Sequence, residues 1–101
     1  MLILALYPNL LNVSFVQKDD VMTFPIENGE ALHNLINDEY FSLEEGLSTM
    51  IWDSLDGSIS VEGIIDMISD QYQMDKSIVE KDTKDFINNL FENGLIEKID
   101  K

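Results

Sequence analysis

The 101-residue chain contains no cysteine and no arginine. Without cysteine it can form no disulfide, no thiolate metal site and no cysteine nucleophile, and this composition is in keeping with a cytoplasmic protein. Its six basic residues are all lysines and face twenty acids, so the formal net charge is −14. This charge argues against binding to nucleic acid or to an anionic membrane surface. It favours a basic partner.

The sequence also offers few residues for catalysis or for holding a cofactor. His33 is the only histidine, and one histidine with scattered carboxylates makes a poor zinc site. The five glycines stand apart from one another, so no glycine-rich loop could cradle a phosphate. Adjacent acids such as Glu44 and Glu45 point apart on a helix or strand, which argues against an acid–base pair. We therefore expect no enzymatic activity, no cofactor and no metal site.

No segment has the features of a membrane span or of a secretory signal. Residues 1–17 carry no charged side chain, but the apolar run over 1–7 is far shorter than the about 20 residues that a span needs. A signal peptide would begin with basic residues, which this segment lacks. Pro8 marks a turn. We expect two short extended pieces, near 2–7 and 12–17, that complete the core rather than present an apolar docking surface.

The pattern after this segment predicts three strands. Residues 21–26 carry apolar side chains on both faces, and Pro25 removes one backbone donor, which favours an edge position. The Asn-Gly pair at 28–29 is a strong hairpin signal. A return strand over 31–36 and a third strand over 40–43 would complete a three-stranded antiparallel meander.

A capping box marks the expected junction between the strands and the helices. Ser42 and Glu45 have the spacing at which each side chain can bond the backbone N–H of the other residue. This spacing predicts a first helix over about residues 43–55, with Trp52 in the core. The helix would end before Gly57, because glycine readily adopts the left-handed conformation at a helix C-terminus.

Ser60 and Asp75 are predicted to be the N-caps of two further helices. The second helix has an expected buried stripe of Ile64, Ile65, Ile68 and Tyr72. The third helix, over 75–93, has an apolar face made of Val79, Thr83, Phe86 and Leu90, widened by Ile87 and Phe91. Residues 95–99 are expected to add a short strand or to pack as a tail.

Three strands followed by three helices predict an α+β fold with a winged-helix-like arrangement. We expect a single domain over residues 1–101, made of an apolar N-terminal extension (1–20), strands (21–43), three helices (44–94) and a tail (95–101). Winged helices often bind DNA through their last helix. Here that helix carries more acids than lysines and would be repelled by a phosphate backbone, so the expected function is not DNA binding.

Three stretches carry a resemblance to a known family: Tyr-Phe-Ser-Leu-Glu-Glu-Gly at 40–46, Ile-Trp-Asp-Ser-Leu-Asp-Gly at 51–57, and Phe-Ile-Asn-Asn-Leu-Phe-Glu-Asn-Gly-Leu-Ile at 86–96. Over about residues 21–97 the chain resembles the PqqD-like peptide chaperones, also called RiPP recognition elements. The resemblance implies a non-catalytic protein that binds the leader region of a ribosomally synthesised precursor peptide. In this family the leader adds a strand between the third strand and the third helix. The implied partner is a separate modifying enzyme, such as a radical-SAM maturase or the protease and cyclase of a lasso-peptide pathway.

Carried onto this chain, the resemblance implies that the leader contacts Tyr40, Phe41, Ser42 and Leu43 on the strand, and Val79, Asp82, Thr83, Phe86, Ile87 and Leu90 on the helix. Some of the apolar residues on the helix must belong to the core instead, and the sequence leaves open which. Asp82 and Asp85 share one helical face and are candidates for contact with a basic leader, although a solvated face is the simpler interpretation. The alternative function is a winged-helix protein–protein adaptor or regulator that binds no peptide substrate.

Overall fold

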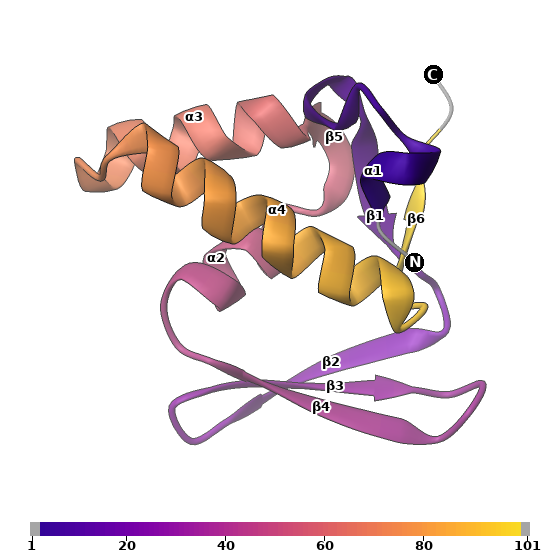
Figure 1. Cartoon of the computed structure of the whole chain (residues 1–101). Helices are drawn as coiled ribbons and strands as arrows, with labels where there is room; N and C mark the ends of the chain where they lie inside the picture. The colour runs from indigo at the N-terminus through magenta and orange to yellow at the C-terminus, as the bar shows by residue number, and fades with distance from the viewer. Residues whose placement is uncertain (1–2, 100–101) are drawn as a thin grey trace.

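The computed structural model describes residues 3–99, which form an α+β fold of two three-stranded sheets with helices packed on them (Figure 1). In chain order the elements are α1 (Ile3–Leu6), the 3₁₀ helix η1 (Leu10–Asn12), β1 (Ser14–Gln17), β2 (Val21–Ile26), β3 (Gly29–Asn34), β4 (Glu39–Glu44), α2 (Leu47–Asp53), β5 (Asp56–Ser60), α3 (Val61–Tyr72), α4 (Lys76–Glu92) and β6 (Ile96–Lys98). The strand orders are β2-β3-β4 and β5-β1-β6, all antiparallel. The α+β prediction is confirmed, and the second sheet is additional to the single meander that was expected.

The predicted meander is present as β2, β3 and β4. Ile26 pairs with Gly29, so a two-residue turn joins β2 to β3. Asn28 in this turn has a positive φ of 64°, which asparagine tolerates better than most residues. A Cβ at Gly29 would overlap the backbone carbonyl of Leu43, so only glycine lets β3 and β4 approach this closely. The hairpin prediction is confirmed, with the return strand beginning two residues earlier than expected.

The capping-box prediction is wrong. Ser42 lies in the middle of β4, where it pairs with Ala31. The strand continues to Glu44, and the N–H of Glu45 then bonds the carbonyl of Asn28 at 2.9 Å. A six-pair ladder with β3 satisfies more backbone groups than one capping box could. Helix α2 therefore begins after Gly46, four residues later than predicted.

Other details of α2 also differ from the prediction. The N–H of Gly46 donates to the Thr49 hydroxyl at 3.2 Å, and that hydroxyl donates to the Gly46 carbonyl at 3.0 Å. The helix ends at Asp53, earlier than expected, and the chain re-enters an extended conformation as β5. Gly57 does have a positive φ of 83°, but within β5, where its bare backbone lies against the Ile99 side chain. The glycine therefore serves close packing of a strand and not the end of a helix.

The caps of the two long helices are confirmed. The Ser60 hydroxyl accepts the N–H of Gly63 at 3.1 Å at the start of α3. The Asp75 carboxylate accepts the N–H of Ser77 at 2.9 Å at the start of α4. The expected buried stripe of α3 is correct except for Tyr72, which is 48% exposed. Tyr72 is the last residue of α3, where the turn into α4 projects past the sheet (Figure 1).

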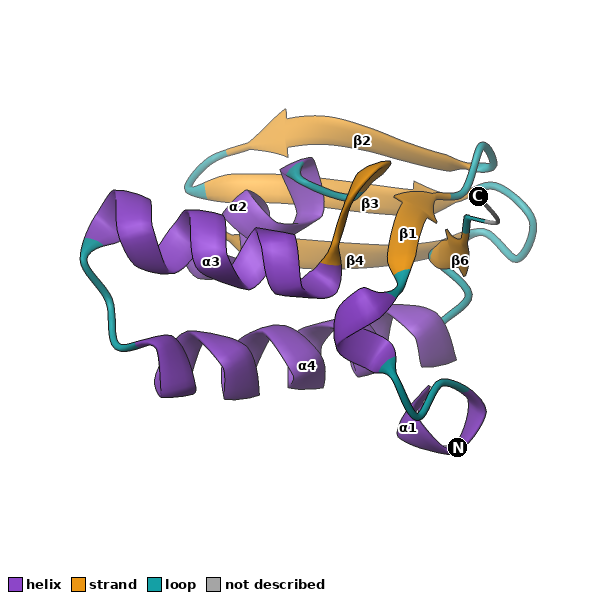
Figure 2. Cartoon of the chain, turned by 90° about the horizontal axis from the view of Figure 1, so that it is seen from above, coloured by secondary structure: helices purple, strands orange, loops and turns teal. Residues whose placement is uncertain are grey.

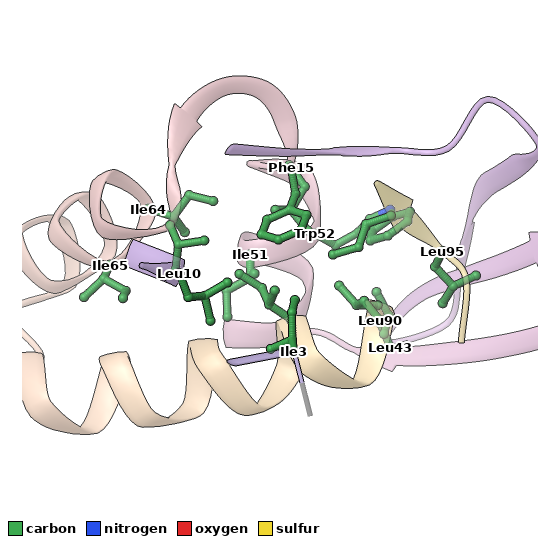
Figure 3. Packing of buried hydrophobic residues seen from close by; sticks show 14 of the residues in the cluster. Ile3, Leu10, Phe15, Leu43, Ile51, Trp52, Ile64, Ile65, Leu90 and Leu95 are labelled. Atoms are coloured by element: carbon green, nitrogen blue, oxygen red, sulfur yellow. The ribbon is translucent and has the colours of Figure 1, made fainter. Parts of the chain in front are cut away.

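The N-terminal segment is part of the core. Ile3, Leu10 and Phe15 belong to the buried core, and Figure 3 shows them among residues of β4, α2, α3 and α4. The N–H of Ile3 also donates to the Asn88 side chain of α4 at 2.7 Å. The expectation of core completion is confirmed, and so is the extended piece near 12–17, which is β1. The prediction of an extended piece near 2–7 is wrong for the described residues, because residues 3–6 are helical and pack on α4.

Trp52 is fully buried, as predicted. Its indole N–H donates to the hydroxyl of Thr23 at 3.0 Å, which joins α2 to the inner face of the meander. Ile51 beside it is also buried, and both lie near Phe15 in Figure 3. Helix α2 is therefore held between the two sheets by a large apolar contact and one satisfied polar group. Among residues 3–99, no helix is long and apolar enough to cross a membrane.

Candidate functional site

Strand β4 has an open edge. Within the described part of the chain it pairs with β3 and with no second strand. The hydrogen bond from the N–H of Glu45 to the carbonyl of Asn28 continues the register of the β3–β4 ladder. In an antiparallel ladder every second residue exchanges hydrogen bonds with the neighbouring strand, so Leu43 and Phe41 also bond to β3. The N–H and C=O groups of Tyr40, Ser42 and Glu44 consequently point away from β3. These outward groups can form a template for an incoming strand.

Helix α4 lies alongside this open edge. Viewed from above, it is on the β4 side of the meander and far from β2 (Figure 2). A pocket of about 400 Å³ separates the two elements and is lined by Leu32, Phe41, Ser42, Leu43, Glu44, Ser48, Phe86, Asn89, Leu90 and Leu95. A second pocket of about 440 Å³ is lined by Leu47, Ser48, Ile51, Asp82, Asp85, Phe86 and Asn89. Because Ser48, Phe86 and Asn89 line both, the two pockets form one groove, which we call the β4–α4 groove.

The structure brings seven of the predicted site residues together in the β4–α4 groove. On the strand these are Phe41, Ser42 and Leu43; on the helix they are Asp82, Asp85, Phe86 and Leu90. Tyr40 lies in the same strand but points to the opposite face of the sheet, where it is 62% exposed and stacks on His33. Val79, Thr83 and Ile87 are fully buried and face the core. Of the apolar candidates on α4, Phe86 therefore faces the groove, Val79 and Ile87 face the core, and the buried Leu90 belongs to the core and also lines the groove.

The acidic end of the groove is partly neutralised by the chain itself. Lys81 donates to the Asp85 carboxylate at 3.0 Å, one helical turn along α4. This hydrogen bond and the charge of Asp85 raise the pKa of Lys81, and Asp82 adds a smaller contribution. Asp82 and Asp85 both line the groove on the α2 side. A basic side chain placed there would meet one carboxylate already bonded to lysine and a second next to it.

Several groove residues were not predicted from the sequence. Leu47 and Ser48 were assigned to the interior of a helix that was expected to start near residue 43, whereas they form the first turn of α2 and close one end of the groove. Asn89 lies one turn from Asp85 on α4, so the groove face of that helix could have been extended from its periodicity. Leu95 follows the helix and reaches the groove only because Gly94 turns the chain back.

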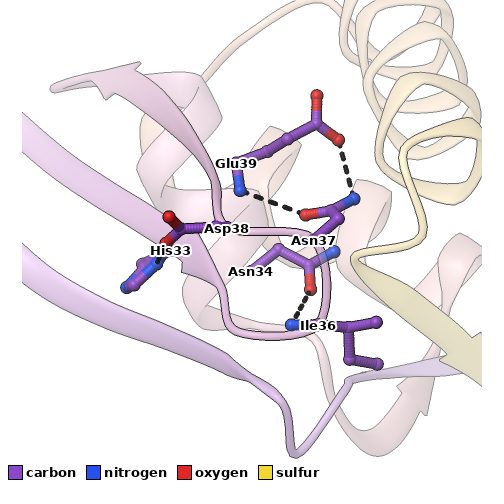
Figure 4. Close-up of polar contacts among 6 residues, drawn as sticks. All are labelled: His33, Asn34, Ile36, Asn37, Asp38 and Glu39. Carbon is purple, nitrogen blue, oxygen red and sulfur yellow. Dashed lines mark hydrogen bonds and ion pairs between the residues drawn. The ribbon is translucent and has the colours of Figure 1, made fainter.

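The turn that precedes β4 is fixed by side-chain hydrogen bonds (Figure 4). The Asn37 side chain accepts the N–H of Glu39 at 3.1 Å and donates to the Glu39 carboxylate at 2.7 Å. The Asn34 side chain accepts the N–H of Ile36 at 3.0 Å. His33 is bonded to Asp38 at 2.7 Å, so the only histidine is tied to this turn. These bonds hold the start of the open edge in one position.

No group of three or more His, Cys, Asp or Glu side chains within residues 3–99 is arranged to hold a metal ion. One cluster of acids lies outside the groove, where Glu30 of β3 and Asp53 of α2 line a separate pocket with Glu45. Burial raises the pKa of Glu30, and the hydrogen bond and charge of Asp53 raise it further. This pair was not predicted from the sequence, since the two residues are far apart in the chain.

An edge strand that faces a helix across an open groove defines a class of α+β domains that can take up an additional strand. The sequence model of the PqqD family, described as coenzyme PQQ synthesis protein D, matches residues 28–96. The chain therefore belongs to the PqqD family. The match includes the meander from its first turn onward and ends within β6, so it contains the whole β4–α4 groove.

Two solved structures have similar folds. The structure titled "TbiB1 in Complex with the TbiA(beta) Leader Peptide" is 29% identical, with a TM-score of 0.73, and the match covers 85% of this chain and 99% of the other. The structure titled "Lasso peptide synthetase B1 complexed with the leader peptide" is 19% identical, with a TM-score of 0.73, covering 83% and 98%. At that lower identity the likeness shows the fold alone. No curated protein sequence matches the chain.

Proposed function

We propose that this chain binds the leader region of a ribosomally synthesised precursor peptide in the β4–α4 groove and catalyses no reaction itself. The leader adds a strand to the open edge of β4 and is thereby delivered to a separate modifying enzyme, a radical-SAM maturase or a lasso-peptide protease and cyclase. The observation that carries this proposal is the open edge beside an apolar groove. The 29%-identical TbiB1 structure, which was solved in complex with a leader peptide, supports it.

The backbone of β4 and the side chains of the groove contribute differently to peptide recognition. The outward N–H and C=O groups of Tyr40, Ser42 and Glu44 bond to the main chain of any extended peptide. Every second side chain of that peptide then points into the groove, since side chains alternate along a strand. There it meets the half-buried rings of Phe41 and Phe86. The backbone groups supply sequence-independent affinity, and these rings select apolar residues at alternate positions of the leader.

Amide hydrogen exchange tests this mechanism residue by residue. The probe is the synthetic leader of a candidate precursor peptide, sought as a short reading frame near the gene of this chain, and a scrambled peptide is the control. We expect the leader to slow exchange at Tyr40, Ser42 and Glu44, whose amides point outward. Phe41 and Leu43 already donate to β3, so their exchange should change less. Protection confined to residues 3–17 or to α3 would contradict edge-strand capture and favour an adaptor without a peptide substrate.

A further inference from the structure

The solvent face of the β2–β3–β4 sheet is more apolar than a solvated sheet face normally is. Leu32 and Leu43 are buried and Thr23 bonds Trp52, so these residues define the inner face. The alternate residues of β2 then point outward: Met22 is 53% exposed, Phe24 is 37% and Ile26 is 40%. An antiparallel sheet with one wet face usually places its polar residues there. On β2 the outward positions hold the large apolar side chains.

The register gathers these residues into one patch. Met22 lies opposite His33, which lies opposite Tyr40, and Phe24 lies opposite Ala31. The His33 and Tyr40 rings stack with their centroids 4.1 Å apart. We call the surface formed by Met22, Phe24, Ile26 and Tyr40 the outer patch. Figure 1 shows the helices on the other face of this sheet, so no described element covers the patch.

The charges around the outer patch are all of one sign. Residues 19–75 contain no lysine, and the chain contains no arginine. Glu27 in the β2–β3 turn is exposed beside the patch, and Glu44 is exposed at the opposite edge of the sheet. A second copy of the chain would bring a further charge of −14 and the same acids against this surface. The patch therefore suits a different protein, with an apolar centre and lysine or arginine around it.

The outer patch remains free while the groove is occupied. The two sites share β4, but an incoming strand uses the edge of β4 and the space beside α4, whereas the patch lies on the opposite face. Exposed apolar surface rimmed by charge is typical of protein interaction sites. We propose that the outer patch is the docking surface for the peptide-modifying enzyme, which presents an apolar area ringed by basic side chains. This inference rests on the proposed function, since it assumes that a bound leader must be handed to an enzyme.

Two matched variants test the outer patch. Met22→Ser with Phe24→Ser removes its centre, and Met67→Ser with Ile78→Ser removes equally exposed apolar residues from α3 and α4. The probe is a purified candidate peptide-modifying enzyme, sought among the reading frames near the gene of this chain, with affinity measured by calorimetry. We expect the first variant to weaken enzyme binding at least about tenfold and the second to change it less than about twofold. Met22→Ser alone, which alters the most exposed large apolar residue of β2, should give part of the loss.

Leader affinity, measured by fluorescence anisotropy on the same variants, separates this inference from the proposed function. We expect it to be unchanged in both, because neither variant alters a residue that lines the groove. A wild-type chain that binds no leader contradicts the proposed function. A wild-type chain that binds leader but no enzyme, or equal enzyme affinity in the two variants, overturns the docking surface. A dimer in sedimentation that Met22→Ser dissociates also overturns it, since a second copy would then occupy the patch.

The dependence of enzyme binding on salt tests whether the partner has a basic rim. Enzyme affinity should fall as salt rises from about 0.05 to 0.3 M, because exposed charges across an interface are screened over this range. Glu27→Gln should lower the association rate and reduce the salt dependence while leaving leader affinity unchanged. Enzyme binding that strengthens with salt would contradict a basic rim on the partner.

Discussion

Thr83 is fully buried on α4, and its hydroxyl has no hydrogen-bond partner among the described residues. An unsatisfied buried hydroxyl costs free energy, and valine has nearly the same shape without it. We expect Thr83→Val to raise the free energy of unfolding by about 1 kcal/mol, measured by urea denaturation. Leader affinity should not change, because Thr83 faces the core. A weakened leader complex with unchanged stability would mean that Thr83 contacts the leader, one of the two alternatives that the sequence left open.

Alanine variants of Ser60 and Ser42 should differ in stability, because Ser60 caps a helix and Ser42 lies in a strand. Ser60 accepts the N–H of Gly63, so Ser60→Ala should cost about 0.5–2 kcal/mol of stability. Ser42 was predicted to be a cap but is exposed in β4. Ser42→Ala should therefore leave the melting temperature close to that of the wild type. Equal losses in the two variants would contradict the helix start after Gly46.

Glu30 makes stability depend on pH. Its pKa is raised above the ordinary value of 4.5 by burial first and by Asp53 second. The folded state then holds the proton more tightly than the unfolded chain, so stability falls as pH rises from 4.5 through the raised pKa. We expect Glu30→Gln to raise the melting temperature relative to the wild type at about pH 7, and to give little gain at about pH 4. Glu27→Gln, at an exposed turn, controls for removing one negative charge from the chain.

The helix starts that depend only on neighbouring residues in the sequence were predictable. The caps at Ser60 and Asp75 need only a side-chain oxygen and the next few amides, and both were found from spacing alone. The same reasoning failed at Ser42, because its pairing partner in β3, Ala31, lies outside the few residues that a capping pattern takes into account. The four-residue α1 is too short to be stable by itself and exists through its packing on α4. Sequence periodicity therefore predicts an element best when no distant strand competes for its backbone.

Phe86 and Ile87 are adjacent on α4, but Phe86 faces the groove and Ile87 faces the core. Phe86 is half-buried and lines both pockets of the groove, whereas Ile87 is fully buried. We expect Phe86→Ala to weaken leader binding by about 2–4 kcal/mol in calorimetry, as for an interface anchor. Ile87→Ala should instead cost about 2–5 kcal/mol of stability in a thermal or urea melt. If Phe86→Ala lowered stability as much as Ile87→Ala and left leader affinity intact, the groove would not be the binding site.

At the scale of the whole molecule, the meander and three helices were predictable but the β5-β1-β6 sheet was not. Its strands come from the two ends and the middle of the chain, and only long-range pairing such as Phe15 with Lys98 reveals it. The groove was predicted in outline, as a strand edge beside the last helix. Its lining could not be completed, because Leu47 and Leu95 reach it through turns at Gly46 and Gly94 whose geometry the sequence does not show.

The charge distribution of the whole molecule leads to the last prediction, that the chain binds no nucleic acid. The net charge is −14, and the lysines of α4 are already engaged. Lys76 pairs with Asp66 at 2.8 Å, Lys81 with Asp85 at 3.0 Å and Lys84 with Glu80 at 3.0 Å. Phosphate binding gains its free energy when lysines or arginines displace the counterions of the backbone. Here each lysine of the last helix would first have to leave a carboxylate on its own chain.

Fluorescence anisotropy with a labelled duplex at about 0.15 M salt checks this prediction. We expect no saturation at about 10 µM protein, which is within the range where non-specific binders already associate. Replacing Asp82 and Asp85 by lysine reverses the charge on one face of α4 and frees Lys81, so this variant should bind more strongly than the wild type at low salt. Submicromolar binding by the wild type would mean that α4 acts as a recognition helix despite its acids, and the DNA-binding role of winged helices would then apply to this chain.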